Sequence, residues 1–271
     1  MDTRLERQVQ WYPGHMAKAL RRIAEYLRAI DVVIEVVDAR VARSGRNAVL
    51  DQLVASRTRV IALDREDLAD PAVTKRWIAD FARRGYEAIA VDGRSARSVA
   101  RIGEVISRSP GRRKTTAASR AMIVGIPNSG KSTIVNALLR RSAAKTEGRA
   151  GVTRHVSWFR LAPGVELMDT PGVLPPKISK GTSQWKLALC GAVPYERYDP
   201  QEIVAAFVRW LQARDPRSSV PDLAAFAGAR GFVRRGGEPD YHNAAQSYIR
   251  AFNEGAFGRI SLEAPDDAEA A

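Results

Sequence analysis

Runs of apolar residues alternate with amphipathic stretches over the first third of the chain. A β-branched apolar run predicts a buried strand over 31–38, and shorter runs predict strands over 58–63 and 87–91. Apolar residues at helical spacing predict helices over 16–30 and 71–84. Strands that alternate with helices indicate an α/β fold with a mostly parallel sheet covered on both faces.

The alternating pattern resumes after a basic stretch without periodicity over 108–119, which we interpret as a linker. A strand predicted over 121–124 runs straight into a glycine-rich loop, and another is predicted over 165–168. Strand signals stop after about residue 183, and helices are predicted to begin at Pro200 and after Pro239. We therefore predict two domains, residues 1–182 with the sheet and residues 183–271 all-helical.

Composition narrows the possible partners. The 271 residues carry a formal net charge of +13, which favours polyanions and above all nucleic acid. The single cysteine, Cys190, excludes an intramolecular disulfide and a cysteine metal cluster. Neither a membrane-spanning run nor a signal-peptide pattern is present in the sequence. We expect a cytoplasmic protein that acts as a monomer.

The glycine-rich loop fits the P-loop pattern over Gly125–Ser132, in the strand–loop–helix context that the pattern requires. Lys131 would reach the β- and γ-phosphates, and the Ser132 hydroxyl would hold Mg²⁺. Backbone N–H groups and the helix N-terminus would surround the phosphates. The residues predicted to contact the phosphates are Asn128, Ser129, Gly130, Lys131, Ser132 and Thr133.

Two further segments fit a nucleoside triphosphatase. Asp169 follows a predicted strand and could hold the Mg²⁺ shell, while the N–H of Gly172 could sense the γ-phosphate. Thr153 lies between these residues and the P-loop, where it could supply a second hydroxyl to Mg²⁺. Lys131, Thr153 and Gly172 are therefore the catalytic candidates in this part of the chain.

The residues that read the base are expected after a strand, and nothing downstream of Gly172 fits an Asn-Lys-x-Asp motif. The candidate is upstream, at Asp64, Arg65 and Asp67, which makes the motif order circularly permuted. The carboxylate of Asp67 would accept the guanine N–H donors, and Arg65 could lie over the base. An ionised Asp64 is acceptor-only, so we predict weaker guanine affinity or looser base selectivity than an asparagine would give.

This motif order resembles the circularly permuted GTPases of ribosome biogenesis, and the bacterial ribosome biogenesis GTPase A group in particular. The resemblance covers nearly the whole chain and rests on the P-loop together with Trp11–Lys18, Asp38–Arg40, Asp169–Lys177 and Gly258–Glu263. It implies Mg²⁺-dependent GTP hydrolysis in large-subunit assembly. It also implies a C-terminal helical domain that binds ribosomal RNA, and release from the particle after hydrolysis.

The resemblance also implies two less usual roles. Val173 stands where Ras-like proteins have a water-orienting glutamine, so another group must act on the water, and His15 is the family's usual candidate. A structural role for His15 in the turn after Pro13 is the alternative. Asn128 would help to hold K⁺ between the phosphates, or would form a loop-stabilising hydrogen bond instead.

The sequence departs from the family pattern at Asp64 and Arg65, where the family has Asn and Lys. Alanines at Ala42, Ala48 and Ala150 replace prolines, and the segment 91–95 matches its base-contacting motif poorly. Two rival functions therefore stay open. One is a non-selective NTPase, and the other is an RNA-binding factor that holds nucleotide as a structural ligand.

Overall fold

The computed structural model describes residues 21–108, 119–143, 157–162, 165–170 and 182–267. The candidates His15, Thr153 and Gly172 lie outside the described residues. Part of the first predicted helix is described, and residues 21–27 are helical.

Six strands form one sheet in the order β3-β2-β1-β4-β6-β5. Neighbouring strands from β3 to β6 in this order are parallel. The edge strand β5 runs antiparallel to β6. The predicted mostly parallel sheet is thus confirmed, whereas β5 was not predicted. The strands are β1 (Val32–Asp38), β2 (Thr58–Asp64), β3 (Glu87–Ala90), β4 (Ser119–Val124), β5 (Ser157–Ala162) and β6 (Val165–Asp169).

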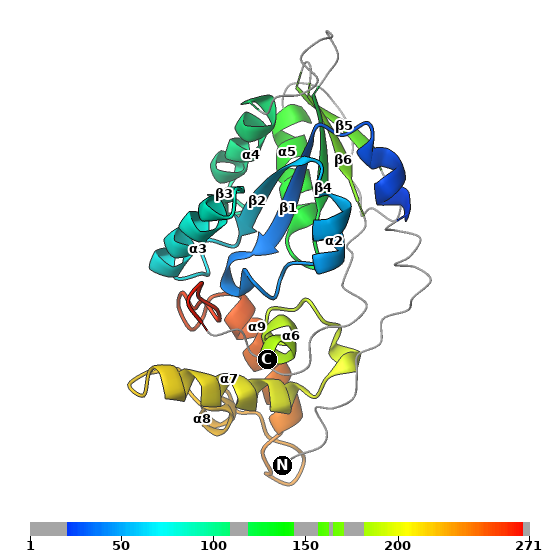
Figure 1. The fold of residues 1–271 in the computed structure, drawn as a ribbon. Helices are drawn as coiled ribbons and strands as arrows, with labels where there is room; N and C mark the ends of the chain where they lie inside the picture. The colour runs from blue at the N-terminus through cyan, green and yellow to red at the C-terminus, as the bar shows by residue number, and fades with distance from the viewer. Residues whose placement is uncertain (1–20, 109–118, 144–156, 163–164, 171–181, 268–271) are drawn as a thin grey trace.

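Helices cover both faces of this sheet (Figure 1). Helices α4 (Ala96–Arg108) and α5 (Lys131–Ala143) pack on one face, against β1, β2, β4 and β6. Residues 21–27, α2 (Ala48–Leu53) and α3 (Pro71–Arg83) pack on the other. All seven residues of the central strand β1 are buried, which explains why its sequence is mostly apolar on both faces rather than alternating, with Glu35 and Asp38 as the charged exceptions.

In the described part of the chain, four α-helices follow the sheet in sequence and lie together at one end of it (Figure 1). They are α6 (Thr182–Leu189), α7 (Pro200–Arg214), α8 (Leu223–Ala229) and α9 (Tyr241–Asn253), and we call them the C-terminal helices. The Asp199 side chain caps α7 by accepting a 2.8 Å hydrogen bond from the Gln201 N–H. Phe207 and Tyr248 are fully buried in a core that these helices share.

The segment after α9 returns to the sheet-containing part of the chain. The N–H of Ile260 donates to the carbonyl of Leu68 at 3.0 Å, and the N–H of Leu262 donates to the carbonyl of Arg40 at 2.8 Å. The C-terminal helices are therefore joined to the loops after β1 and β2 by backbone hydrogen bonds as well as by the chain itself.

Candidate nucleotide-binding site

The carboxyl ends of four neighbouring parallel strands meet at the edge of the sheet that faces the C-terminal helices (Figure 1). Strand β4 leads into the P-loop, β6 ends at Asp169, β1 at Asp38 and β2 at Asp64. Ligands of open α/β sheets bind at this edge. The phosphate candidates and the base candidates are thus brought to one place, although Asp64 and Gly125 are 61 residues apart in the sequence.

The P-loop has the shape of a phosphate-binding loop. Gly130 has a φ of 101°, and a Cβ atom there would clash with the carboxylate of Asp64. Only glycine satisfies both the backbone conformation and the close approach. The Oγ atom of Ser129 is buried and has no hydrogen-bond partner among the described residues. A buried polar atom of this kind is suited to a ligand that can hydrogen-bond to it.

Lys131 begins helix α5 and is 6% exposed, with its Nζ donating to the carbonyl of Ile126 at 2.6 Å. Burial lowers the pKa of Lys131 from 10.5 to about 8, against the nearby negative charge of Asp169. Ser132 and Thr133 are exposed in the first turn of the same helix. The helix N-terminus and the ammonium group together favour an anionic ligand.

Asp169 is 2% exposed and pairs in register with Ile123, close to the start of the P-loop. Its negative charge raises the pKa of Lys131 and so opposes the effect of burial on that group. A carboxylate with the hydroxyl of Ser132 is the kind of oxygen donor set that Mg²⁺ takes, usually beside phosphate oxygens and water. These residues therefore fit the predicted metal.

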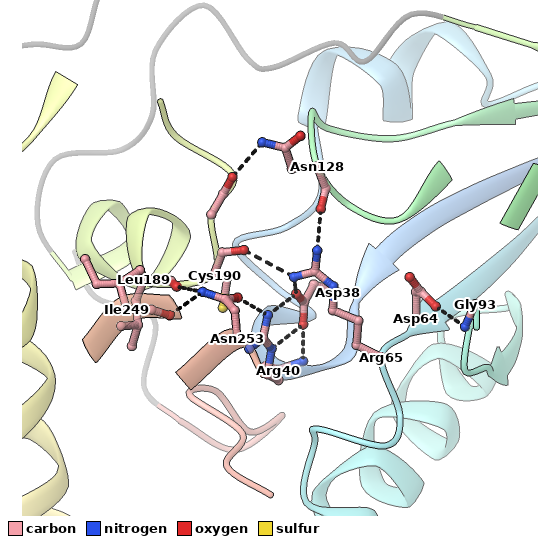
Figure 2. Close-up of polar contacts among 11 residues, drawn as sticks. Asp38, Arg40, Asp64, Arg65, Gly93, Asn128, Leu189, Cys190, Ile249 and Asn253 are labelled. Carbon is pink, nitrogen blue, oxygen red and sulfur yellow. Dashed lines mark hydrogen bonds and ion pairs between the residues drawn. The ribbon is translucent and has the colours of Figure 1, made fainter. Parts of the chain in front are cut away.

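On the base side, Asp64 is 2% exposed and its Oδ1 accepts a 2.8 Å hydrogen bond from the N–H of Gly93 (Figure 2). Burial raises the pKa of Asp64 from 3.8 to about 6, although hydrogen bonds from the backbone of Arg65 and Gly93 oppose the shift. The contact places Gly93 beside Asp64, the first residue of the base-recognition candidate. Asp67 lies three residues further along and is half-buried.

Arg65 and Asn128 are the two non-glycine residues with positive φ in the described part of the chain, at 59° and 57°. Such residues are uncommon and are concentrated at functional sites. The Nη2 atom of Arg65 donates to the carbonyl of Asn128 at 3.0 Å, which joins the base-recognition loop to the P-loop. The Nη1 atom donates to Asp38 and to the carbonyl of Cys190 (Figure 2).

The side chain of Asn128 also has a partner in the C-terminal helical part, because its Nδ2 donates to the carbonyl of Gly191 at 2.8 Å. This bond matches the loop-stabilising alternative for Asn128. Sequence reasoning missed the contacts with Asp38, Cys190 and Gly191. Asp38 could have been singled out, because it is the first residue of the Asp38–Arg40 segment on which the family resemblance rests. Nothing in the sequence indicated that it contacts Arg65.

The order of the strands defines the class of the protein. Strands β1 and β2 come before the P-loop in the sequence. In the sheet they lie on one side of β4, the strand that leads into the P-loop, and β6 lies on its other side. The fold and the site are those of a P-loop GTPase whose base-recognition strand precedes its phosphate loop, which is a circular permutation.

Relatives of this class match nearly the whole chain. The ribosome biogenesis GTPase A of Priestia megaterium is 35% identical over 284 residues, covering 96% of this chain and 98% of the relative. The chain belongs to the ribosome biogenesis GTPase A family. The Thermotoga maritima member is 34% identical over 261 residues, covering 96% of this chain and 95% of the relative.

Solved structures agree with this assignment. The GNP-bound structure of YlqF from T. maritima matches with a TM-score of 0.67 and 30% identity, over 92% of this chain and 99% of that one. The sequence signature of a family described as 50S ribosome-binding GTPase matches residues 120–198. The predictions of the family, of the permuted fold and of a GTP hydrolase are confirmed.

Proposed function

We propose that this GTPase couples GTP hydrolysis to assembly of the large ribosomal subunit. The relatives named for ribosome biogenesis align over 96% of the chain, and its phosphate and base candidates meet at one sheet edge. In this proposal residues 1–182 are the nucleotide-driven switch and residues 183–271 bind the particle. Hydrolysis measured with and without large subunits tests the proposal.

Each phosphate-site residue has a defined task in this proposal. The Nζ atom of Lys131 would leave the carbonyl of Ile126 for the β- and γ-phosphates, which restores the full charge of a buried ammonium group. Ser132, Thr153 and Asp169 would hold Mg²⁺, and Gly172 would sense the γ-phosphate. Mg²⁺ would neutralise charge that develops on the transferred phosphoryl group.

A different side chain must orient the attacking water, because the apolar Val173 follows Gly172. We assign this task to His15, since an imidazole can accept a proton near neutral pH. K⁺ would add positive charge between the phosphates, held by Asn128. The bond from Asn128 to Gly191 uses Nδ2, so it does not compete for the oxygen atom Oδ1 that a cation needs.

The C-terminal helices carry exposed charge suited to ribosomal RNA. Arg250 is exposed on α9, and Arg234, Arg235 and Arg259 are exposed in the segments on either side of that helix. Tyr241 is 37% exposed at the start of α9 and could stack on an unpaired base, whereas Tyr248 is fully buried and serves the core. Relatives occur in bacteria and, under the name mitochondrial ribosome-associated GTPase 1, in Mus musculus. The proposed place of action is therefore where the ribosome is assembled, the cytoplasm in a bacterial cell.

One rival function keeps a specific observation in its favour. Asp64 stands where the family has asparagine, and its carboxylate contacts the Gly93 loop rather than supplying an amide donor. A non-selective NTPase on the same fold would follow if this change removed guanine selectivity. Competition between GTP and ATP for the site separates the two functions.

A further inference from the structure

A row of polar contacts joins the end of helix α9 to the P-loop (Figure 2). The Oδ1 atom of Asn253 accepts a 2.9 Å hydrogen bond from Nη2 of Arg40. Arg40 in turn donates from Nε and Nη2 to the two carboxylate oxygens of Asp38, at 3.0 and 2.8 Å. Asp38 also accepts from Nη1 of Arg65 at 2.9 Å, and Nη2 of Arg65 reaches the carbonyl of Asn128.

The helical end of this row is fixed in orientation. The Nδ2 atom of Asn253 donates to the carbonyls of Leu189 and Ile249, at 2.7 and 2.8 Å. Since both of those partners are acceptors, the amide must present its oxygen to Arg40. The guanidinium of Arg40 also lies over the ring of Phe252, 4.9 Å from the centroid. Asn253 is thus held by α6 and α9 while it holds Arg40.

The middle of the row is buried, so its geometry has little freedom. Arg40 is 1% exposed and Asp38 is 3% exposed. Burial by itself would raise the pKa of Asp38, but the charges and hydrogen bonds of Arg40, with the charge of Arg65, hold it below its ordinary value. Asp38 is therefore an ionised carboxylate that both arginines share, and a change at Arg40 must be felt at Arg65.

The nucleotide end depends on this carboxylate. Arg65 has a backbone conformation that is unfavourable for its residue type, and Asp38 is the charged partner of its guanidinium. A guanidinium that is already held in place loses less entropy when a base packs on it. The row therefore pre-organises the side chain that we assign to the base.

We propose that Asn253 is a positioning residue for nucleotide binding, acting through Arg40 and Asp38 on the guanidinium of Arg65. This inference rests on the proposed contact of Arg65 with the base. It makes the affinity of the sheet edge for guanine nucleotides depend on a side chain of the C-terminal helices.

Two substitutions at one position separate this role from a merely structural one. Asn253→Ala removes the acceptor for Arg40 and both N–H donors. Asn253→Asp removes the donors but keeps an acceptor for Arg40, with a negative charge that the Arg40 guanidinium faces. Both variants should be less stable in thermal unfolding. Asn253→Ala should raise the Kd for GDP about tenfold, and Asn253→Asp should stay within about threefold of the unchanged protein. Equal losses of affinity in the two variants would overturn the inference.

A matched control and a double variant complete the experiment. Asn243→Ala, on the exposed face of the same helix, should leave the Kd for GDP unchanged. Arg65→Ala should weaken GDP binding, and adding Asn253→Ala to it should weaken binding no further. If the losses of GDP affinity in the two single variants add up in the double variant, Asn253 does not act through Arg65. The contact of Arg65 with the base would still stand. No effect of Arg65→Ala would instead overturn the contact of Arg65 with the base, and the inference with it.

Discussion

The Oδ1 atom of Asp64 accepts a hydrogen bond of 2.8 Å from the N–H of Gly93, which ties the base-recognition loop to the loop after β3. An asparagine at this position could accept the same bond, since its side-chain oxygen is also an acceptor. The aspartate has the acceptor Oδ2 where an asparagine would have the N–H donor Nδ2. It also brings a buried negative charge beside Gly130 of the P-loop.

Asp64→Asn should therefore tighten guanine binding. The variant keeps the bond from Gly93 and gains a donor, so the Kd for GDP should fall about five- to tenfold at pH 7.5. The Kd for ADP should change less, because adenine has no carbonyl to accept such a bond. Both constants are measured by displacement of a fluorescent nucleotide. An unchanged ratio of the two would mean that position 64 does not set base selectivity.

The same substitution should stabilise the nucleotide-free protein in a pH-dependent way. Because burial raises the pKa of Asp64 to about 6 from 3.8, the folded chain keeps a proton that the unfolded chain releases between these values. The stability of the folded chain therefore falls as the pH rises from about 4 to 6 and stays at the lower value above pH 6. Asparagine avoids this loss, for a gain on the order of 1–2 kcal/mol at pH 7.5. Thermal unfolding from pH 5 to 8 should show this gain shrinking below pH 6.

A control for the pH series is Glu104→Gln, which removes one negative charge at an exposed position of α4. Its melting temperature should follow that of the unchanged protein at every pH. A stabilisation by Asp64→Asn that is equal at pH 5 and pH 8 would show that removal of the buried charge is not its cause.

Lys131 should make nucleotide binding depend on pH in the alkaline range. Burial lowers its pKa to about 8 in the nucleotide-free protein, so above that pH a growing share of the side chain is neutral. Phosphate binding favours the charged form and must then take up a proton, and the Kd for GDP should rise by up to about tenfold per pH unit. Calorimetry at pH 8.5 in two buffers of different ionisation enthalpy measures the proton uptake directly.

Lys131→Arg is the matched comparison, because a guanidinium stays charged throughout this range. The variant should bind more weakly, and its proton uptake at pH 8.5 should be close to zero. Equal uptake in both proteins would assign the proton to another group.

The His15 proposal is tested by turnover and affinity together. His15→Ala should lower GTP hydrolysis in the presence of large ribosomal subunits by about 10²-fold or more, and leave the Kd for GTP intact. His242→Ala, at an exposed position of α9, is the control and should change neither quantity. Unchanged turnover in His15→Ala would remove His15 from the mechanism.

Much of the fold could be predicted from local patterns. The run over 31–38 marks a strand covered on both faces, and Asp199 with Pro200 marks the start of α7, because these signals depend only on neighbouring residues. The permuted motif order followed from the position of Asp64–Asp67 before the P-loop. Strand β5 was missed, since its apolar residues Trp158, Phe159 and Leu161 neither alternate nor form a continuous run.

The candidate site was predicted less completely, for a physical reason. The P-loop is a local motif and its Lys131 lies where expected, but the partners of Arg65 come from β1 and from the loop after α6. Asn253 is 213 residues from Arg40 in sequence, and only packing of the C-terminal helices brings the two side chains together. Contacts of this kind leave no periodicity or spacing that a single sequence can reveal.

Hydrolysis of GTP and of ATP, each with and without purified large ribosomal subunits in potassium buffer, is the most direct test of the proposed function. We predict turnover that prefers GTP, that rises when the subunits are added, and that falls when sodium replaces potassium. Turnover that does not respond to the particle and does not distinguish GTP from ATP would contradict it. This protein would then share the fold of its family but not the function. The aspartate at position 64, where the family has asparagine, would be the reason.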